Sequence, residues 1–252
     1  MIGYKGRRGK KEMIAILPWG ACEQHGPLLP ITTDTIIAMH IAKQVSERLP
    51  NSIVLEPLFY GVSTEHEGFE GTISMEYKTA IMILEDVFQS VIKNNKEVDL
   101  VIIINGHGGN EEVASLVCKS FNYKYKSTKF ITLHVFPDKT KELAAKLFGA
   151  FSAHADSVES SVIAAITGTM EDQIYDLAEL NGKTSLPHIM KLYPVSESAK
   201  DCGIVSKTNF VEVSMNKGEQ IIESSIDNIL QELKAYQKTI QYMNNLYLSE
   251  NS

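Results

Sequence analysis

The sequence predicts one α/β domain in which a mostly parallel sheet lies between two layers of helices, a three-layer α/β/α sandwich. Apolar segments of strand length alternate along the chain with longer segments of helical periodicity, which is typical of a parallel sheet. Every residue from Leu100 to Ile104 is apolar, as expected of a parallel strand that helices cover on both faces. No linker-like segment divides the 252 residues, so we expect a single domain over residues 1–252.

The predicted strands are short apolar runs bounded by turn-forming residues. They are expected at 13–18, 52–61, 98–105 and 129–136. Between them, the segments 61–71 and 182–203 carry prolines or glycines among polar residues. We expect these two segments to be active-site or interface loops rather than domain boundaries.

The predicted helices are recognised by their periodicity and their starts. Residues 77–94 repeat apolar side chains every three or four positions. The segment 35–48 is too rich in apolar residues for one narrow stripe, which predicts a largely buried helix ending near Pro50. Asn110, followed by two glutamates, is a good start for another helix. Further helices are expected at 139–148, from 157 to a residue before Gly168, and over 219–247 as one long or two shorter helices.

Charge and cysteine content narrow the function classes. The net charge of −7 does not favour a nucleic-acid partner, which needs a basic stripe. The basic stretch Lys5–Lys11 is interpreted as a solvated tail, because the apolar run behind it is too short for a signal peptide. No apolar run reaches the length that crosses a bilayer, so no membrane partner is expected. Three cysteines without a CxxC pair fit a reducing compartment, and we expect a cytoplasmic protein.

Two polar clusters follow predicted strands. Glu23, His25 and Asp34 come after the first strand, and His107 lies between glycines after the central one. Ligands of open α/β sheets bind beyond the carboxyl ends of the strands, so the two clusters are expected to meet. Carboxylates and imidazoles together suit zinc, manganese or divalent iron. A carboxylate shared by two ions would give a two-metal hydrolytic site.

Each of these residues also has a structural interpretation. Glu23 and His25 could be a solvated loop pair, and Asp34 could cap the helix that follows it. His107 could be a turn histidine beside a phosphate loop, although GHGGNE does not match GxGxxG because residue 111 is Glu. A serine esterase is not favoured, because no GxSxG elbow occurs in the sequence.

Four motifs in the first two-thirds of the chain resemble those of the creatininase family, the creatinine amidohydrolases. GACEQHGPLLPITTDT at 20–35 resembles the Glu-x-His-Gly-Pro signature, and INGHGGN at 104–110 resembles the second motif. EHEGFEGTIS at 65–74 resembles a third motif, and HADSVESS at 154–161 is similar to a fourth. The motifs occur in the family's order, which makes a chance match very improbable.

The resemblance implies a three-layer fold, a site for two divalent ions (zinc or manganese, with iron as another option) and often a homo-oligomer, a hexamer. Glu23 and His107 correspond to ligands of one ion, His25 and Glu159 to ligands of the other, and Asp34 to the ligand between them. His154 corresponds to the catalytic histidine, five residues before Glu159 as in the family. His66, Ser74 and Gly108 are expected to contact the substrate.

The chain departs from creatininase itself in the second motif. Gly108 and Gly109 stand where creatininase has tyrosine and glutamate, and Trp19 is the only tryptophan. The glycines are expected to leave room for a substrate larger than creatinine. We therefore expect a metal-dependent amidohydrolase that cleaves the C–N bond of a small cyclic amide or formamide with a metal-activated water. The alternatives are a formamidopyrimidine-nucleotide deformylase, a peptide-trimming enzyme of the same family, and a homologue that binds a metabolite without turnover.

Overall fold

The structure is a computed structural model that describes residues 13–95, 97–125, 127–151, 154–180, 183–184 and 202–249. At 183–184 and 240–249 it describes the backbone alone. The predicted tail at Lys5–Lys11 and most of the predicted loop at 182–203 lie outside the described residues.

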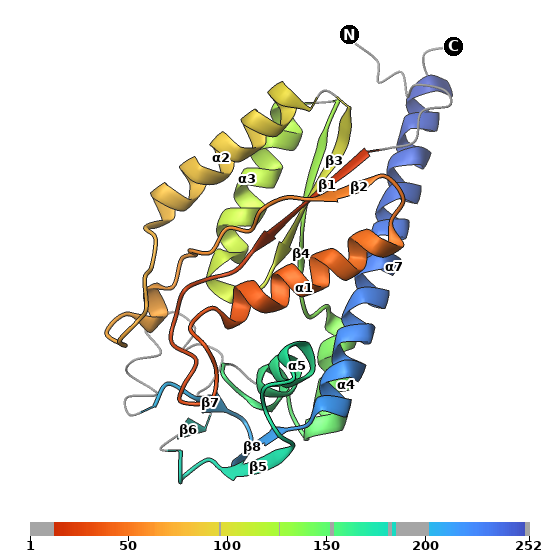
Figure 1. Cartoon of the computed structure of the whole chain (residues 1–252). Helices are drawn as coiled ribbons and strands as arrows, with labels where there is room; N and C mark the ends of the chain where they lie inside the picture. Colours follow the sequence, from red (N-terminus) through yellow and green to blue (C-terminus); the bar gives the residue numbers. More distant parts are fainter. Residues whose placement is uncertain are drawn as a thin grey trace.

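A parallel sheet of four strands, in the order β2-β1-β3-β4, forms the centre of the molecule (Figure 1). The strands are β1 (Met13–Trp19), β2 (Ser52–Val54), β3 (Val98–Asn105) and β4 (Lys129–His134). From Ile14 opposite Leu100 to Trp19 opposite Asn105, β1 and β3 pair without interruption. The two strands therefore end at the same level, and the loops that follow them start side by side.

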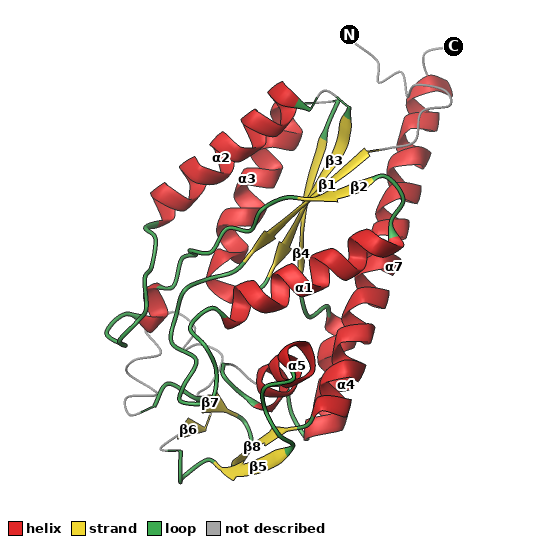
Figure 2. Ribbon diagram, viewed as in Figure 1, coloured by secondary structure: helices red, strands yellow, loops and turns green. Residues whose placement is uncertain are grey.

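Side chains of β1 alternate between two apolar cores, as the two-residue period of a strand requires. Ile14 and Ile16 pack with α1 (Thr33–Arg48), α4 (Asp138–Phe148), α5 (Ser157–Thr167) and α7 (Met215–Ser249). Ala15 and Leu17 pack with α2 (Tyr77–Asn94) and α3 (Glu111–Lys124) on the other face. Helices thus cover both faces of the sheet (Figure 2), which confirms the predicted three-layer α/β/α sandwich.

The predicted second strand is wrong in its length. β2 ends at Val54, whereas the sequence predicted a strand to residue 61. Beyond Val54 the chain still touches β1, because Leu58 N donates to Pro18 O at 3.0 Å and forms an isolated bridge with Trp19. Pro57 lies between the end of β2 and Leu58. It has no N–H to donate to β1, which interrupts the ladder.

The other predicted strands and helices of the sandwich are confirmed within a few residues, and residues 215–249 form one helix, α7. Four short strands were not predicted. They are β5 (Gln173–Asp176) with β8 (Phe210–Val213), antiparallel, and β6 (Lys183–Thr184) with β7 (Val205–Ser206), parallel. They are only two to four residues long, too short for the apolar alternation by which strands are recognised. Within the described residues, no helix combines the length and apolar character needed to cross a membrane.

The connections out of β1 and β3 lead to opposite sides of the sheet. The chain passes from β1 through α1 to β2 on one side, and from β3 through α3 to β4 on the other. The carboxyl ends of β1 and β3 are therefore the point at which the strand order reverses. Open α/β sheets bind their ligands at such a point.

Candidate metal centre

Seven histidines and carboxylates converge beyond the carboxyl ends of β1 and β3. Glu23 and His25 lie in the loop after β1, Asp34 in the first turn of α1 and His66 in the short 3-10 helix η1 (Thr64–His66). His107 follows β3, His154 lies just before α5, and Glu159 lies in the first turn of α5. All of them except Glu159 are buried. Buried ionisable groups at this density require partners for their charges.

Gly106 brings the two polar clusters of the sequence together. A Cβ at this position would collide with the carbonyl oxygen of Asp34. The backbone after β3 therefore passes directly against the first turn of α1, an approach that only glycine permits. As a result, His107 Nδ1 lies 3.3 Å from Asp34 Oδ2.

The first group of possible metal ligands is Glu23, Asp34 and His107. His107 Nδ1 is 3.2 Å from Glu23 Oε2 and 3.3 Å from Asp34 Oδ2. Both carboxylate oxygens are buried, and neither accepts a hydrogen bond within the part of the chain that is described. Buried anionic oxygens need a positive charge beside them, which either a charged His107 or a bound cation supplies.

The second group is His25, His154 and Glu159. His25 Nε2 lies 3.2 Å from Asp34 Oδ1 and 3.9 Å from Glu159 Oε2. Asp34 thus directs one oxygen at each group, which is the arrangement expected of the ligand between two ions. The sequence predicted His154 as a catalyst, and the structure also brings it within ligand distance of His25 and Glu159.

The start of α5 holds Glu159 in place. Asp156 is the N-cap of this helix, and its side chain accepts hydrogen bonds from the backbone N–H groups of Val158 and Glu159. The N–H of Ala155 donates to Glu159 Oε2 at 2.7 Å. Asp156 therefore has a structural role in fixing the turn that carries the carboxylate.

A third group joins Glu23 to His66 and His154. His66 Nε2 lies 3.3 Å from Glu23 Oε1, and the His66 and His154 rings are 4.2 Å apart. The sequence predicted His66 only as a substrate contact. Its approach to Glu23 was not foreseen, because nothing in the chain order relates the third motif to the first.

The pKa values show how protons are shared in the cluster. Burial disfavours the charged form of His25, but the Asp34 carboxylate outweighs it and raises the pKa of the imidazole to about 10. Burial also opposes charge on His107, yet Glu23 and Asp34 raise its pKa well above the usual value. Burial raises the pKa of Glu159 to about 8, although His25 acts in the opposite direction. A divalent cation entering the cluster would therefore displace protons from these groups.

At His66 and His154, burial outweighs the nearby carboxylates and lowers the pKa of the imidazole. It lowers the pKa of His66 to about 4, even though Glu23 favours the charged form. It lowers the pKa of His154 well below the usual value, and the nearby His66 and His25 add to that shift. Both rings are therefore neutral near pH 7.

The residues present fit a pair of divalent cations. The donor set combines buried carboxylate oxygens and imidazole nitrogens, which suits zinc, manganese or divalent iron. The two oxygens without hydrogen bonds, Glu23 Oε2 and Asp34 Oδ2, point into the cluster beside His107.

The structure contradicts the interpretation of Asp34 as a helix cap, because the N-cap of α1 is Thr32 and no side chain caps this helix.

The remaining predicted site residues, Ser74 and Gly108, are not among the possible metal ligands. Ser74 Oγ accepts a hydrogen bond from Ser63 N at 2.8 Å and lies 3.3 Å from Met75 O, so it fixes the loop that carries His66. Gly108 is exposed, with no atom within 4 Å of the place where a Cβ would stand. Open space beside His107 agrees with a substrate contact there. The substrate roles of both residues stay predictions.

Gly109 does not provide the room that the sequence predicted. A Cβ here would collide with Val62 O and would stand 2.9 Å from Glu65 Oε1. Only Gly108 therefore opens space beside His107. The expectation that both glycines enlarge the substrate site is wrong for Gly109, because the loop before η1 fills that side.

This difference predicts opposite effects for two alanine variants. Gly109→Ala is expected to destabilise the protein by about 1–3 kcal/mol, as overpacking does. Gly108→Ala is expected to change stability by no more than about 0.5 kcal/mol. Urea unfolding of both variants measures the difference. Equal stabilities would contradict the close contact between Gly109 and Val62.

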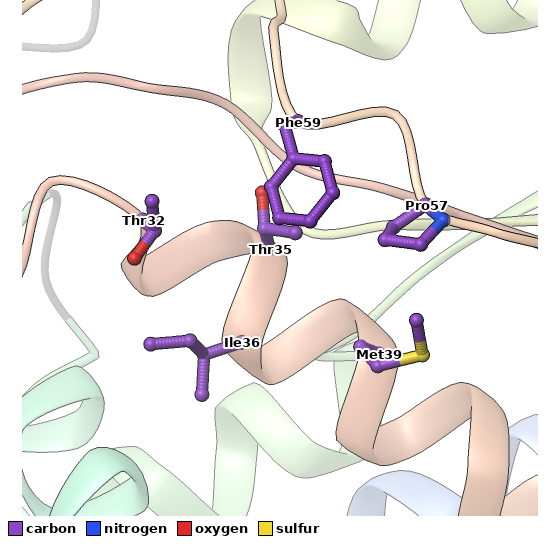
Figure 3. Close-up of a pocket in the computed structure, with 6 residues that line it drawn as sticks. All are labelled: Thr32, Thr35, Ile36, Met39, Pro57 and Phe59. Atoms are coloured by element: carbon purple, nitrogen blue, oxygen red, sulfur yellow. The ribbon is translucent and has the colours of Figure 1, made fainter.

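An apolar pocket of about 170 Å³ lies between α1 and the segment that follows β2 (Figure 3). It is lined by Thr32, Thr35, Ile36, Met39, Pro57 and Phe59. Figure 3 shows Phe59 and Pro57 facing the helix residues across the opening. No histidine or carboxylate of the centre lines it, so it is separate from the candidate metal centre.

Curated proteins of known activity include relatives of this chain. The mycofactocin precursor peptide peptidase of Mycolicibacterium smegmatis is 32% identical over 155 residues, which cover 60% of this chain and 56% of that protein. This chain thus spans about half the length of the curated peptidases that it matches. The 2-amino-5-formylamino-6-ribosylaminopyrimidin-4(3H)-one 5'-monophosphate deformylase of Methanobrevibacter ruminantium is 26% identical over 223 residues, 86% of this chain and 87% of the relative.

Solved structures share the fold. A manganese form of creatininase superposes with a TM-score of 0.71 at 21% identity, covering 89% of this chain and 91% of that one. The family model for creatininase, described as creatinine amidohydrolase, matches residues 5–233. The resemblance of the four motifs is thereby confirmed over nearly the whole chain, and the protein belongs to the creatininase family.

Proposed function

We propose that this protein is a hydrolase that cleaves the C–N bond of an amide in a small molecule and needs two divalent cations, zinc or manganese with iron as an alternative. Glu23, Asp34 and His107 would hold one cation, and His25 and Glu159 the other, with Asp34 shared. The observation that supports this most is the position of Asp34, whose two oxygens face His107 and His25 at 3.3 Å and 3.2 Å.

The cations, when bound, would activate a water molecule and polarise the substrate carbonyl. His154 supplies the proton transfer. Its Nε2 lies 2.6 Å from the carbonyl oxygen of Gln24, so Nε2 carries the hydrogen and Nδ1 faces the centre as an acceptor. A neutral imidazole in this orientation accepts a proton from the attacking water and returns it to the leaving nitrogen, which is too basic to depart without one.

The substrate class follows from the relatives and from the space beside His107. One relative is named a peptidase and another a deformylase, and both names denote cleavage of a bond between a carbonyl carbon and nitrogen. A cyclic amide or a formamide is the first candidate. A short peptide is the second, because the open space at Gly108 leaves room for a substrate that extends out of the centre.

Reconstitution with zinc or manganese tests the proposal. We expect metal analysis to give close to two ions per chain, and a screen of cyclic ureides, formamides and short peptides to find a hydrolysis that chelators abolish. Glu23→Gln serves as the inactive variant, and Glu56→Gln, an exposed glutamate that follows β2, as its matched control. Two bound ions with no hydrolysis of any amide would instead indicate a metabolite-binding homologue.

Assembly and location complete the proposal. We propose a homo-oligomer, a hexamer by family resemblance, and the exposed apolar side chains of Phe59, Tyr60 and Ile73 support it. Light scattering that gives the mass of one chain would contradict this. Cys22 and Cys118 are buried thiols outside any disulfide, which supports a cytoplasmic location.

A further inference from the structure

His66 differs from the other imidazoles of the centre in the partners of its ring nitrogens. The ring is buried, at 3% exposure, and lies between Gln24 and Glu23. Its Nδ1 is 2.9 Å from Gln24 Nε2, and its Nε2 is 3.3 Å from Glu23 Oε1. Which nitrogen carries the hydrogen decides whether His66 can bind a cation together with Glu23.

The orientation of the Gln24 amide answers this question. Gln24 Oε1 accepts a hydrogen bond from Gly26 N at 3.0 Å, and Gln24 Nε2 donates to Gly203 O at 3.1 Å. If the amide were turned over, its NH₂ group would face the N–H of Gly26, so two donors would meet. Its oxygen would face the carbonyl oxygen of Gly203, so two acceptors would meet. The amide is therefore fixed, and the second hydrogen of Nε2 points at His66 Nδ1. Nδ1 must accept, so the ring hydrogen is on Nε2 and faces Glu23.

In the other three imidazoles, the ring hydrogen is directed at the backbone instead of at a carboxylate. His107 Nε2 lies 2.8 Å from Val62 O, His25 Nδ1 lies 3.1 Å from Glu23 O, and His154 Nε2 lies 2.6 Å from Gln24 O. A carbonyl oxygen only accepts, so each ring donates to the backbone. The remaining nitrogen of each ring faces the carboxylates, and it can offer a lone pair to a cation that displaces any proton bound there.

We propose that His66 is a positioning residue and not a metal ligand: it donates a hydrogen bond from Nε2 to Glu23 Oε1 and thereby turns Glu23 Oε2 toward Asp34 and His107. Gln24 is the residue that fixes the tautomer. This inference rests on the proposed metal function, and it excludes the group of Glu23, His66 and His154 as an ion site. Outer partners that orient a carboxylate ligand in this way typically change metal affinity by about 10–100-fold.

The first experiment is performed on the wild-type chain, so it does not depend on a variant that folds. Nitrogen-15 labelling of histidine and two-bond ¹H–¹⁵N correlation identify the tautomer of each ring in the zinc-loaded protein and in the protein without zinc. His66 is expected to carry its hydrogen on Nε2 in both. A hydrogen on Nδ1 with zinc bound would overturn the proposal.

The second experiment compares His66→Ala with His40→Ala, a half-buried histidine of α1 away from the centre. His66→Ala should still bind two zinc ions, with affinity at one of them weakened about 10–100-fold in chelator competition. His40→Ala should bind as the wild type does. Loss of one ion would make His66 a ligand, and a raised KM with unchanged zinc affinity would make it a substrate contact; either result overturns the proposal.

A third variant tests the role of Gln24. Gln24→Glu replaces the NH₂ group by an oxygen that only accepts, so His66 must carry a hydrogen on Nδ1. The correlation spectrum is expected to show that change together with weaker zinc binding. An unchanged His66 signal would contradict the role of Gln24. Failure of the wild-type chain to bind any zinc would refute the proposed function, while the tautomer of His66 would still be measured.

Discussion

An Asp34→Asn variant is expected to hold no more than one divalent cation per chain and to lose hydrolysis. The two oxygens of Asp34 face His25 and His107, and Asn keeps the shape of the side chain while removing its charge and one acceptor. The loss should exceed the roughly 10–100-fold effect of an outer partner such as His66. Metal analysis after gel filtration and an assay of the screened substrate measure both effects.

Asp138→Asn is the matched control for this variant. Asp138 also lies in the first turn of a helix, α4, but its side chain is 93% exposed and belongs to none of the three groups of possible metal ligands. The control should retain both ions and full activity. If Asp34→Asn also retained both ions and hydrolysed substrate normally, Asp34 would not be the shared ligand and the proposed function would fail.

A His154→Gln variant is expected to lower kcat by about 10²–10⁴-fold while both metal ions remain bound. The amide of Gln can still donate to Gln24 O in place of His154 Nε2, so the structural hydrogen bond is retained. What is lost is the acceptor at Nδ1, which lies 3.7 Å from Glu23 Oε1 and faces the centre. Steady-state kinetics and metal analysis of the same preparation check the prediction.

Comparison with His154→Ala separates three roles for this residue. If His154 transfers protons, the Gln and Ala variants lose kcat to a similar extent. If it only supports the backbone at Gln24, the Gln variant keeps its activity and the Ala variant loses stability. If it binds a cation beside His25 and Glu159, either variant loses one ion from the protein. Only the first outcome agrees with the proposed function.

The sequence predicted those features of the fold and the site that follow from the pattern of residues along one segment or from the order of the strands. Leu100 to Ile104 are apolar at every position because helices cover both faces of β3, so the pattern predicted a buried parallel strand. Glu23, Asp34 and His107 could be expected to meet because they follow strands that are adjacent in a parallel sheet. The four motifs then indicated the family, which the comparison confirmed.

The remaining features depend on contacts between segments far apart in the chain. The tautomer of His66 is set by Gln24 and Gly203, and no spacing rule relates these residues to one another. Gly109 looks like open space in the sequence, but Val62 lies against it. The sequence predicted a long second strand because apolar residues continue to Tyr60. In the structure β2 ends at Val54, because Pro57 interrupts the pairing.

Because buried carboxylates lie beyond the carboxyl ends of β1 and β3, the stability of the folded protein should also depend on the supply of transition metals. A bound cation takes the place of the protons that the carboxylates otherwise hold on His25 and His107, and it binds the native state only. A ligand that binds only the native state adds about 2.7 kcal/mol at a hundredfold excess over its Kd. Since a whole domain is stable by only about 5–15 kcal/mol, a cell starved of metal would hold less of this protein and lose more to proteolysis.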